Sequence, residues 1–88
     1  MENLERLRLL GEGFNNRLSE NEIKFALSYI DFNEVPLALD ILCNYICEHD
    51  VSVSREEYGE IVFLNENFGS PLGRKILSYL RNLISNDQ

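Results

Sequence analysis

The stretch from Glu34 to Asp50 is the feature of this 88-residue chain that most constrains its fold. Its sequence is EVPLALDILCNYICEHD, and the spacing of its apolar residues predicts one helix of about four turns. Apolar side chains occupy one broad face and extend around both sides. A helix this apolar must be covered by other helices. Its one continuous polar stripe consists of Asp40, Asn44 and Glu48.

Two amphipathic segments precede the central helix and two follow it. The first two are predicted over residues 2–10 and 20–30, where apolar residues recur at helical spacing. The other two follow Ser54 and Pro71, and the earlier of them ends near Gly69. The link between the second segment and the central helix is very short, so these two helices should be antiparallel neighbours.

The fold class follows from these segments and from the length of the chain. We predict an all-α fold, a compact bundle of four to five short helices around a central helix at about residues 34–50. A chain of this size is near the lower limit for burying a core without disulfides or metals. We therefore expect a single helical domain over residues 1–88. The apolar content of 44% is ordinary for a folded globule, which argues against disorder.

Local signals predict where the helices begin. In a capping box, a Ser side chain and a Glu three residues later each satisfy a free backbone N–H. The chain has two such pairs, Ser19 with Glu22 and Ser54 with Glu57. Asn33 is the predicted N-cap of the central helix, since Asn is favoured at that position. Pro71 is predicted at the first position of the last helix, where proline is tolerated.

The charge balance excludes several kinds of partner. The chain carries 15 acidic and 8 basic residues, which gives a net charge of −7. This argues against direct nucleic-acid binding, which needs Lys and Arg to neutralise phosphates, and against docking on anionic lipid. No apolar run is long enough for a membrane span. Two interpretations remain, which are a surface charged for solubility and a surface that attracts a basic partner.

The two cysteines and the single histidine do not suggest a metal site or a cofactor. Cys43 and Cys47 are four residues apart on the central helix, and only His49 is near them, whereas structural zinc needs about four ligands. Two side chains stacked along one intact helix are also poorly placed for a disulfide. Small reduced thiols and an N-terminus without a signal-peptide pattern favour the cytoplasm.

The sequence shows no catalytic constellation. His49 lies between Glu48 and Asp50 near a helix C-terminus, where a partly positive histidine is favourable, and no nucleophile motif accompanies it. The length and acidity are similar to those of acyl carrier proteins, but the chain lacks their Asp-Ser-Leu tripeptide. We therefore expect a protein that is not an enzyme and binds no cofactor.

An acidic surface is the remaining candidate for a functional site. Acidic residues concentrate in the middle of the chain, whereas basic residues concentrate toward its ends. The predicted partner-binding residues are Asp31, Glu34, Asp40, Asn44, Glu48, Asp50, Glu56, Glu57 and Glu60. An alternative is an acidic helical adaptor or regulator, in which exposed aromatic residues mediate self-association as a homodimer. The residues for that alternative are Phe25, Tyr29 and Phe32.

The stretch RLSENEIKFALSYIDFNEVPLALDILCNYICEHDVSVSREEYGEI resembles the MafI-type immunity proteins. These are small bacterial proteins encoded beside polymorphic or contact-dependent growth-inhibition toxins. The resemblance covers roughly residues 15–64. Its motifs are Arg17-Leu18-Ser19, the acidic residues Asp31 and Glu34, Leu37-Ala38-Leu39-Asp40, the acidic segment 48–50, Val53-Ser54 and Glu56-Glu57-Tyr58. The chain departs from the family pattern at Val35-Pro36. Most matched positions are core and capping residues, so they indicate a fold family more than a role for each residue.

The resemblance implies an antitoxin that binds the C-terminal domain of a cognate toxin, one to one. Toxins in such loci are often ribonucleases, including EndoU-type enzymes. A nuclease has a basic substrate cleft, and an acidic protein can cover that cleft without any turnover. The acidic surface above is then the expected contact with the toxin.

Overall fold

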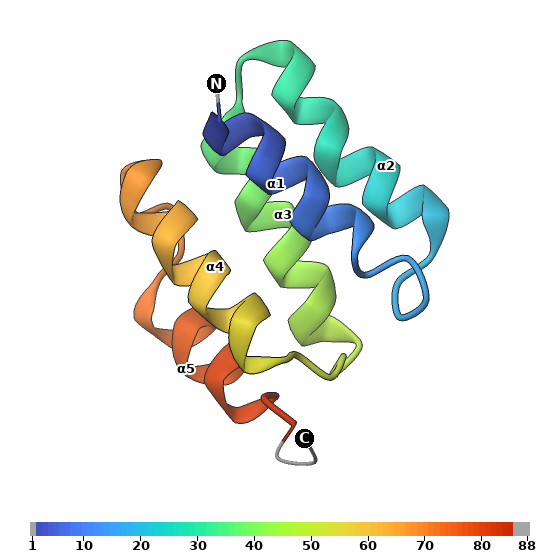
Figure 1. Ribbon diagram of the computed structural model, residues 1–88, viewed down its shortest axis with the longest axis vertical. Helices are drawn as coiled ribbons and strands as arrows, with labels where there is room; N and C mark the ends of the chain where they lie inside the picture. The colour runs from blue at the N-terminus through green and yellow to red at the C-terminus, as the bar shows by residue number, and fades with distance from the viewer. Residues whose placement is uncertain (1, 86–88) are drawn as a thin grey trace.

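The computed structural model of the protein describes residues 2–85 and confirms the predicted all-α fold (Figure 1). The described part of the chain contains five α-helices and one short 3₁₀ helix, joined by turns and loops. In order, these are α1 (Glu2–Glu12), α2 (Glu20–Ser28), the 3₁₀ helix η1 (Tyr29–Phe32), α3 (Val35–Glu48), α4 (Arg55–Asn67) and α5 (Arg74–Asn82).

Helix α3 is the centre of the core, as its apolar sequence predicts. It contacts each of the other four α-helices and η1. Leu39, Leu42 and Ile46 are completely buried, and the small residues Ala38 and Cys43 are buried beside them. Burying a large aliphatic side chain contributes about 1.5–3 kcal/mol, so this one face of α3 supplies a large share of the folding energy.

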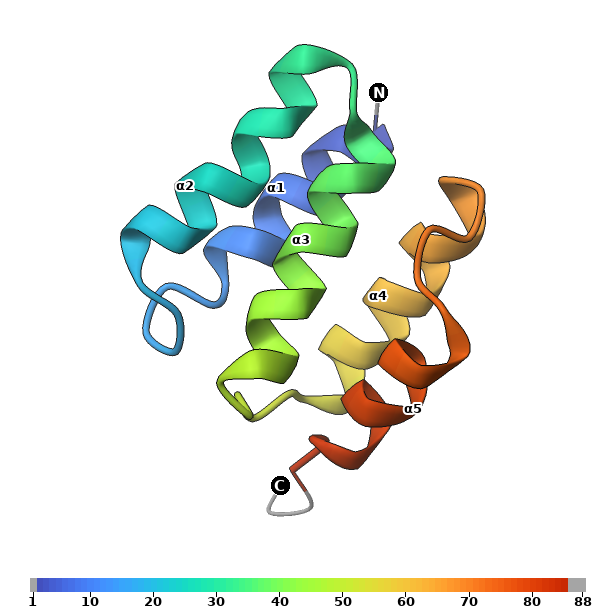
Figure 2. The same cartoon turned by 180° about the vertical axis from the view of Figure 1, so that it is seen from behind.

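The other helices are arranged so that α3 is enclosed on most of its circumference. Helices α2 and α3 pack side by side and run antiparallel, as the short link predicts (Figures 1 and 2). Helix α1 continues through Gly11, which is buried, and a Cβ atom at that position would lie 3.1 Å from the side chain of Leu27. The missing side chain therefore lets α1 approach α2 closely.

Both predicted capping boxes are present. Glu22 N donates to Ser19 Oγ at 3.1 Å, and Ser19 N donates to the Glu22 carboxylate at 3.1 Å. The Ser54 and Glu57 pair repeats this exchange at 2.9 and 3.0 Å. Each box satisfies two backbone donors that the first turn of a helix leaves free. The starts of α2 and α4 are thus fixed by residues three positions apart.

The prediction that Asn33 caps α3 is wrong. The chain leaves α2 through the 3₁₀ turn η1, and Asn33 ends that turn in the left-handed conformation with φ of 61°. Asn tolerates this conformation better than most residues. The N-cap of α3 is Glu34, whose backbone N–H donates to the Tyr29 carbonyl at 2.9 Å and whose side chain makes no capping bond.

The predicted start of the last helix at Pro71 is also wrong, because α5 begins at Arg74 after an N-cap at Gly73. The intervening loop is fixed by Asn65, whose buried side chain accepts a 2.9 Å hydrogen bond from Leu72 N. The side chain of Leu72 is buried in the core. The chain must therefore stay non-helical long enough to bring Leu72 inside.

A short parallel bridge joins the α3–α4 connection to the end of α5. Val53 N donates to Leu83 O at 3.0 Å, and Ser85 N donates to Val53 O at 2.9 Å. The side chain of Val53 is completely buried. This contact attaches the C-terminal part of the described chain to its middle.

Replacing Leu42 with alanine tests the central role of α3. The substitution leaves a cavity in the core, so Leu42→Ala should lower the free energy of unfolding by about 2–5 kcal/mol in urea denaturation. The matched control is Leu9→Ala, because Leu9 is 60% exposed and its loss should change stability by about 0.5 kcal/mol or less. Equal unfolding midpoints for the two variants would contradict the core assignment.

Candidate interaction surface

One side of α3 is not covered by another helix, because in Figure 2 it runs between α2 and α5 with no helix in front of it. The polar stripe of α3 consists of residues that reach the surface. Asn44 and Glu48 are exposed, and Asp40 is half-buried. Asn44 Nδ2 donates to Asp40 Oδ1 at 3.0 Å and to its carbonyl oxygen at 2.7 Å. Leu37 and Ile41 share this helix face, exposed and half-buried respectively. The stripe is therefore a narrow acidic surface with an apolar border.

Two further predicted residues lie at the ends of α3. Glu34 is exposed at the N-cap, where its charge is favourable for the helix dipole. Asp50 follows the C-terminus of α3 with φ of 49°, and its carboxylate accepts a hydrogen bond from the Tyr79 hydroxyl of α5. This hydrogen bond and the charge of Asp50 raise the pKa of Tyr79. Asp50 is thus partly engaged in joining α3 to α5.

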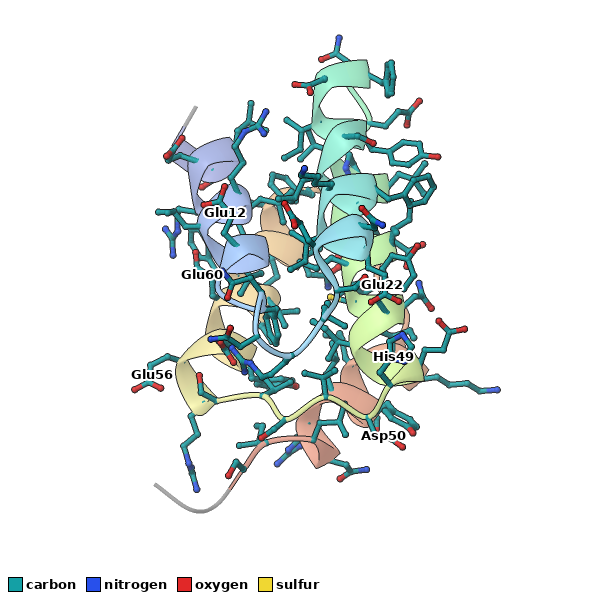
Figure 3. All side chains as sticks on the ribbon, turned by 90° about the vertical axis from the view of Figure 1, so that its right-hand side faces the viewer. Glu12, Glu22, His49, Asp50, Glu56 and Glu60 are labelled. Carbon is teal, nitrogen blue, oxygen red and sulfur yellow. The ribbon has the colours of Figure 1, made fainter. Side chains whose placement is uncertain are left out.

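The remaining acidic residues do not lie with the stripe. Figure 3 shows Glu56 and Glu60 on the left of the molecule and Asp50 on its right. Glu56 and Glu60, together with Glu57, belong to α4, which contacts α1. Of the nine residues predicted as one binding surface, five lie on α3 and at its ends, three lie on α4, and Asp31 lies in η1. Those five are Glu34, Asp40, Asn44, Glu48 and Asp50.

Arginines of the N-terminal part of the chain engage three of the predicted carboxylates. Arg6 forms two hydrogen bonds to Glu60, at 2.6 and 2.7 Å. Arg17 contacts both carboxylate oxygens of Glu57, at 2.9 and 2.7 Å. The third pair, Arg8 with Asp31, is exposed and longer, at 3.2 Å. The partners of the first two pairs are 54 and 40 positions apart, so no local pattern in the sequence could reveal them.

These pairs lower the pKa of the carboxyl groups on α4. The hydrogen bonds from Arg6 hold the pKa of Glu60 below its ordinary value. Burial alone raises the pKa of Glu57, but the hydrogen bonds from Arg17 and from the Ser54 backbone outweigh it, so the net shift is downward. Both carboxylates therefore stabilise the contact of α4 with the N-terminal part of the chain.

His49 has a structural partner. Its Nε2 lies 2.8 Å from Glu22 Oε2, and Figure 3 shows the two side chains meeting between α2 and the end of α3. This contact and the hydrogen bond from Ser19 N lower the pKa of Glu22. A single Glu thus caps α2 and binds His49 across the helix pair.

A row of aromatic side chains runs along α2 and η1, and we call Phe25, Tyr29 and Phe32 the aromatic edge. Neighbouring rings meet edge to face, with centroids 5.4 Å apart for Phe25 and Tyr29 and 6.2 Å apart for Tyr29 and Phe32. Phe32 is 69% exposed, Phe25 is 49% exposed, and Tyr29 packs partly against the core. The sequence predicted exposure of these residues but not their mutual packing.

An open groove of about 590 Å³ lies between α1 and α2. Its polar lining carries both charges, including Arg8, Lys24, Glu12 and Asp31, above apolar residues of α2. Arg8 pairs with Asp31, and Lys24 pairs with Glu20 at 3.2 Å. No histidine or cysteine lines this groove, within the described residues.

The cysteines are free thiols in the structure. Cys43 is completely buried, and burial is the main reason that its pKa is raised. Cys47 is half-buried, and its pKa is raised for the same reason and by the charge of Asp50. Between residues 2 and 85, no three His, Cys, Asp or Glu side chains are grouped to hold a metal ion. None of the helices described is long and apolar enough to cross a membrane.

Comparison with protein-family models, with curated proteins and with solved structures gives no match. The resemblance to MafI-type immunity proteins therefore stays a prediction from the residues quoted above.

The lowered pKa of Glu60 predicts a loss of stability in acid. A carboxyl whose folded pKa lies below its unfolded value of about 4.5 stabilises the fold above that pH, and this contribution disappears as the pH falls through the folded pKa. Urea midpoints measured at about pH 7 and about pH 3 should therefore differ less for Glu60→Gln than for the wild type. The control, Glu66→Gln, removes an exposed carboxylate of α4 and should keep the wild-type difference. If both variants keep the wild-type difference between the two midpoints, the contact with Arg6 does not lower the pKa of Glu60.

Proposed function

We propose that this chain is an immunity protein that binds and neutralises a cognate bacterial toxin domain, one to one and without catalysis. The observation that carries this proposal is the acidic stripe of α3, with Asn44 and Glu48 exposed and Asp40 half-buried, in a chain with net charge −7. The resemblance to MafI-type proteins supports the same function. The contact surface is formed by α3 and its ends.

The distribution of ion pairs supports α3 over α4 as the contact with the toxin. Glu57 and Glu60 of α4 already bind Arg17 and Arg6, so a partner would have to displace these arginines to use them. Asp40 accepts a hydrogen bond from the neutral Asn44, and neither Asp40 nor Glu48 forms an ion pair with Lys or Arg among the described residues. Their charges are therefore available to attract a basic surface and to accelerate encounter with it.

The toxin that best fits this surface is a ribonuclease, with EndoU-type enzymes as one class. A ribonuclease binds an anionic substrate in a basic cleft, and an acidic helix face can cover that cleft by shape and charge. Neutralisation then needs only occupancy, and the site of action is the cytoplasm, where the RNA substrate of the toxin is found. The protein itself binds no nucleic acid, metal or cofactor in this proposal.

Reversal of the stripe charges tests the proposed surface. Asp40→Lys combined with Glu48→Lys should weaken binding to the toxin domain encoded beside this protein roughly ten-fold or more, mainly through slower association. Titration calorimetry and association kinetics at low and high salt measure the effect. Cells that co-express the toxin should then lose protection.

The matched control carries the same change in net charge elsewhere. Glu5→Lys combined with Glu66→Lys reverses two exposed residues of α1 and α4 and should leave affinity within about two-fold of the wild type. Thermal unfolding of both variants confirms that each is folded. If the stripe variant protects cells as well as the wild type does, α3 is not the interface. If the wild type protects against no toxin from such a locus, the proposed function itself fails.

A further inference from the structure

The aromatic edge is aligned by a change of helix type. Phe25 and Tyr29 are four residues apart in α2 and at its C-cap, which is the spacing of neighbours on an α-helix. Tyr29 and Phe32 are three residues apart in η1, and side chains at this spacing eclipse one another in a 3₁₀ helix. The switch from α2 to η1 therefore keeps three rings in one row at the surface.

The row is held in place before any partner arrives. Tyr29 packs partly against the core, and its ring contacts the rings on both sides. Its carbonyl oxygen accepts the backbone hydrogen bond from Glu34. Aromatic side chains that are ordered in the free protein lose little entropy on binding, so they suit the centre of an interface.

Elsewhere in the molecule, two phenylalanine rings are each contacted by an arginine side chain. The guanidinium of Arg6 lies 4.0 Å from the ring centroid of Phe63 and forms two hydrogen bonds to Glu60. The guanidinium of Arg17 lies 4.3 Å from the ring centroid of Phe14 and binds Glu57 in the same way. In both cases a planar cation is stacked on a phenyl face while a carboxylate holds its edge.

The aromatic edge has exposed rings, and no arginine of the described part of the chain lies over them. Between residues 20 and 40 the chain carries five acidic residues and one basic residue, Lys24. Three of the five are already engaged, because Glu22 binds His49, Asp31 binds Arg8 and Glu20 binds Lys24. Glu34 and Asp40 form no ion pair among the described residues. Lys24 pairs with Glu20 one turn away. Glu34 is exposed two residues after Phe32, and the acidic stripe begins at Asp40 on the adjoining helix. The charge here complements a cationic group from outside the molecule.

We infer that the aromatic edge is the docking site for arginine side chains of a basic protein partner. The guanidinium groups stack on Phe25 and Phe32, and nearby carboxylates, Glu34 among them, bind their edges. This inference rests on the proposed function and deepens it, because it identifies arginine as the chemistry that the toxin domain must present. The acidic stripe of α3 then attracts the basic partner electrostatically, and the rings of the aromatic edge make direct contact with its arginines.

Peptide titration followed by NMR tests this inference without a toxin. Two amidated peptides of equal length, an Arg-Gly repeat and a Lys-Gly repeat, are added to the ¹⁵N-labelled protein. The Arg-Gly peptide should bind more tightly, because guanidinium stacks on rings and ammonium does so less well. Its largest shifts should lie within residues 25–34.

The variant Phe25→Leu combined with Phe32→Leu keeps exposed apolar surface but removes the rings. It should bind the Arg-Gly peptide roughly five-fold more weakly than the wild type. The matched control is Phe63→Leu, which removes a half-exposed ring of α4 and should not change the affinity. Equal affinity for the two peptides, shifts centred elsewhere, or full affinity of the double variant would each overturn the inference.

A second copy of the chain is the competing occupant of the aromatic edge. If shifts at residues 25–34 depend on protein concentration without peptide, and the mass in solution rises to that of a dimer, the edge is a homodimer contact and the inference is wrong. Co-expression separates the two proposals. If the double variant loses peptide binding but still protects against the toxin, the edge is not the toxin contact while the proposed function stands. If the wild type never protects, the proposed function fails whatever the peptide result.

Discussion

The burial of α3 is the constraint on which the rest of the structure depends. Leu39, Leu42 and Ile46 cannot face water, so α1, α2, α4 and α5 are all arranged around one helix of 14 residues. In a chain of this size, nearly every helix is committed to covering that core. The side of α3 that carries Asn44 and Glu48 stays outside this core and faces solvent.

The sequence predicted those parts of the fold that short-range chemistry decides. Ser19 and Ser54 were identified as caps because each box is complete within four residues. The predictions at Asn33 and Pro71 failed because longer-range contacts decide those positions. Burial of Leu72 and its bond to Asn65 delay α5, and the turn η1 displaces the cap of α3. These contacts cannot be predicted from composition and periodicity alone.

The same division applies to the candidate site. The sequence identified the acidic residues, but it could not distinguish those that hold the fold together from those that face solvent. Glu57 and Glu60 are bound by arginines from a distant part of the chain, whereas Asp40 and Glu48 are not. A count of charges along the chain therefore overstates the acidic surface on α4. Five of the nine residues predicted as one surface lie on α3 and at its ends, and the other four lie on α4 and in η1.

The helix-type switch at η1 separates exposed rings from buried residues within one short segment. Phe25 and Phe32 are largely outside the core, and η1 is only four residues long. Substitutions of Phe25 or Phe32 would change this exposed surface while the buried residues, Ile30 of η1 among them, stay in place. The exposed rings and the buried core are thus supplied by different residues within one short segment, Phe25 and Phe32 outside and Ile30 inside. The exposed residues can therefore be substituted without a change in the core.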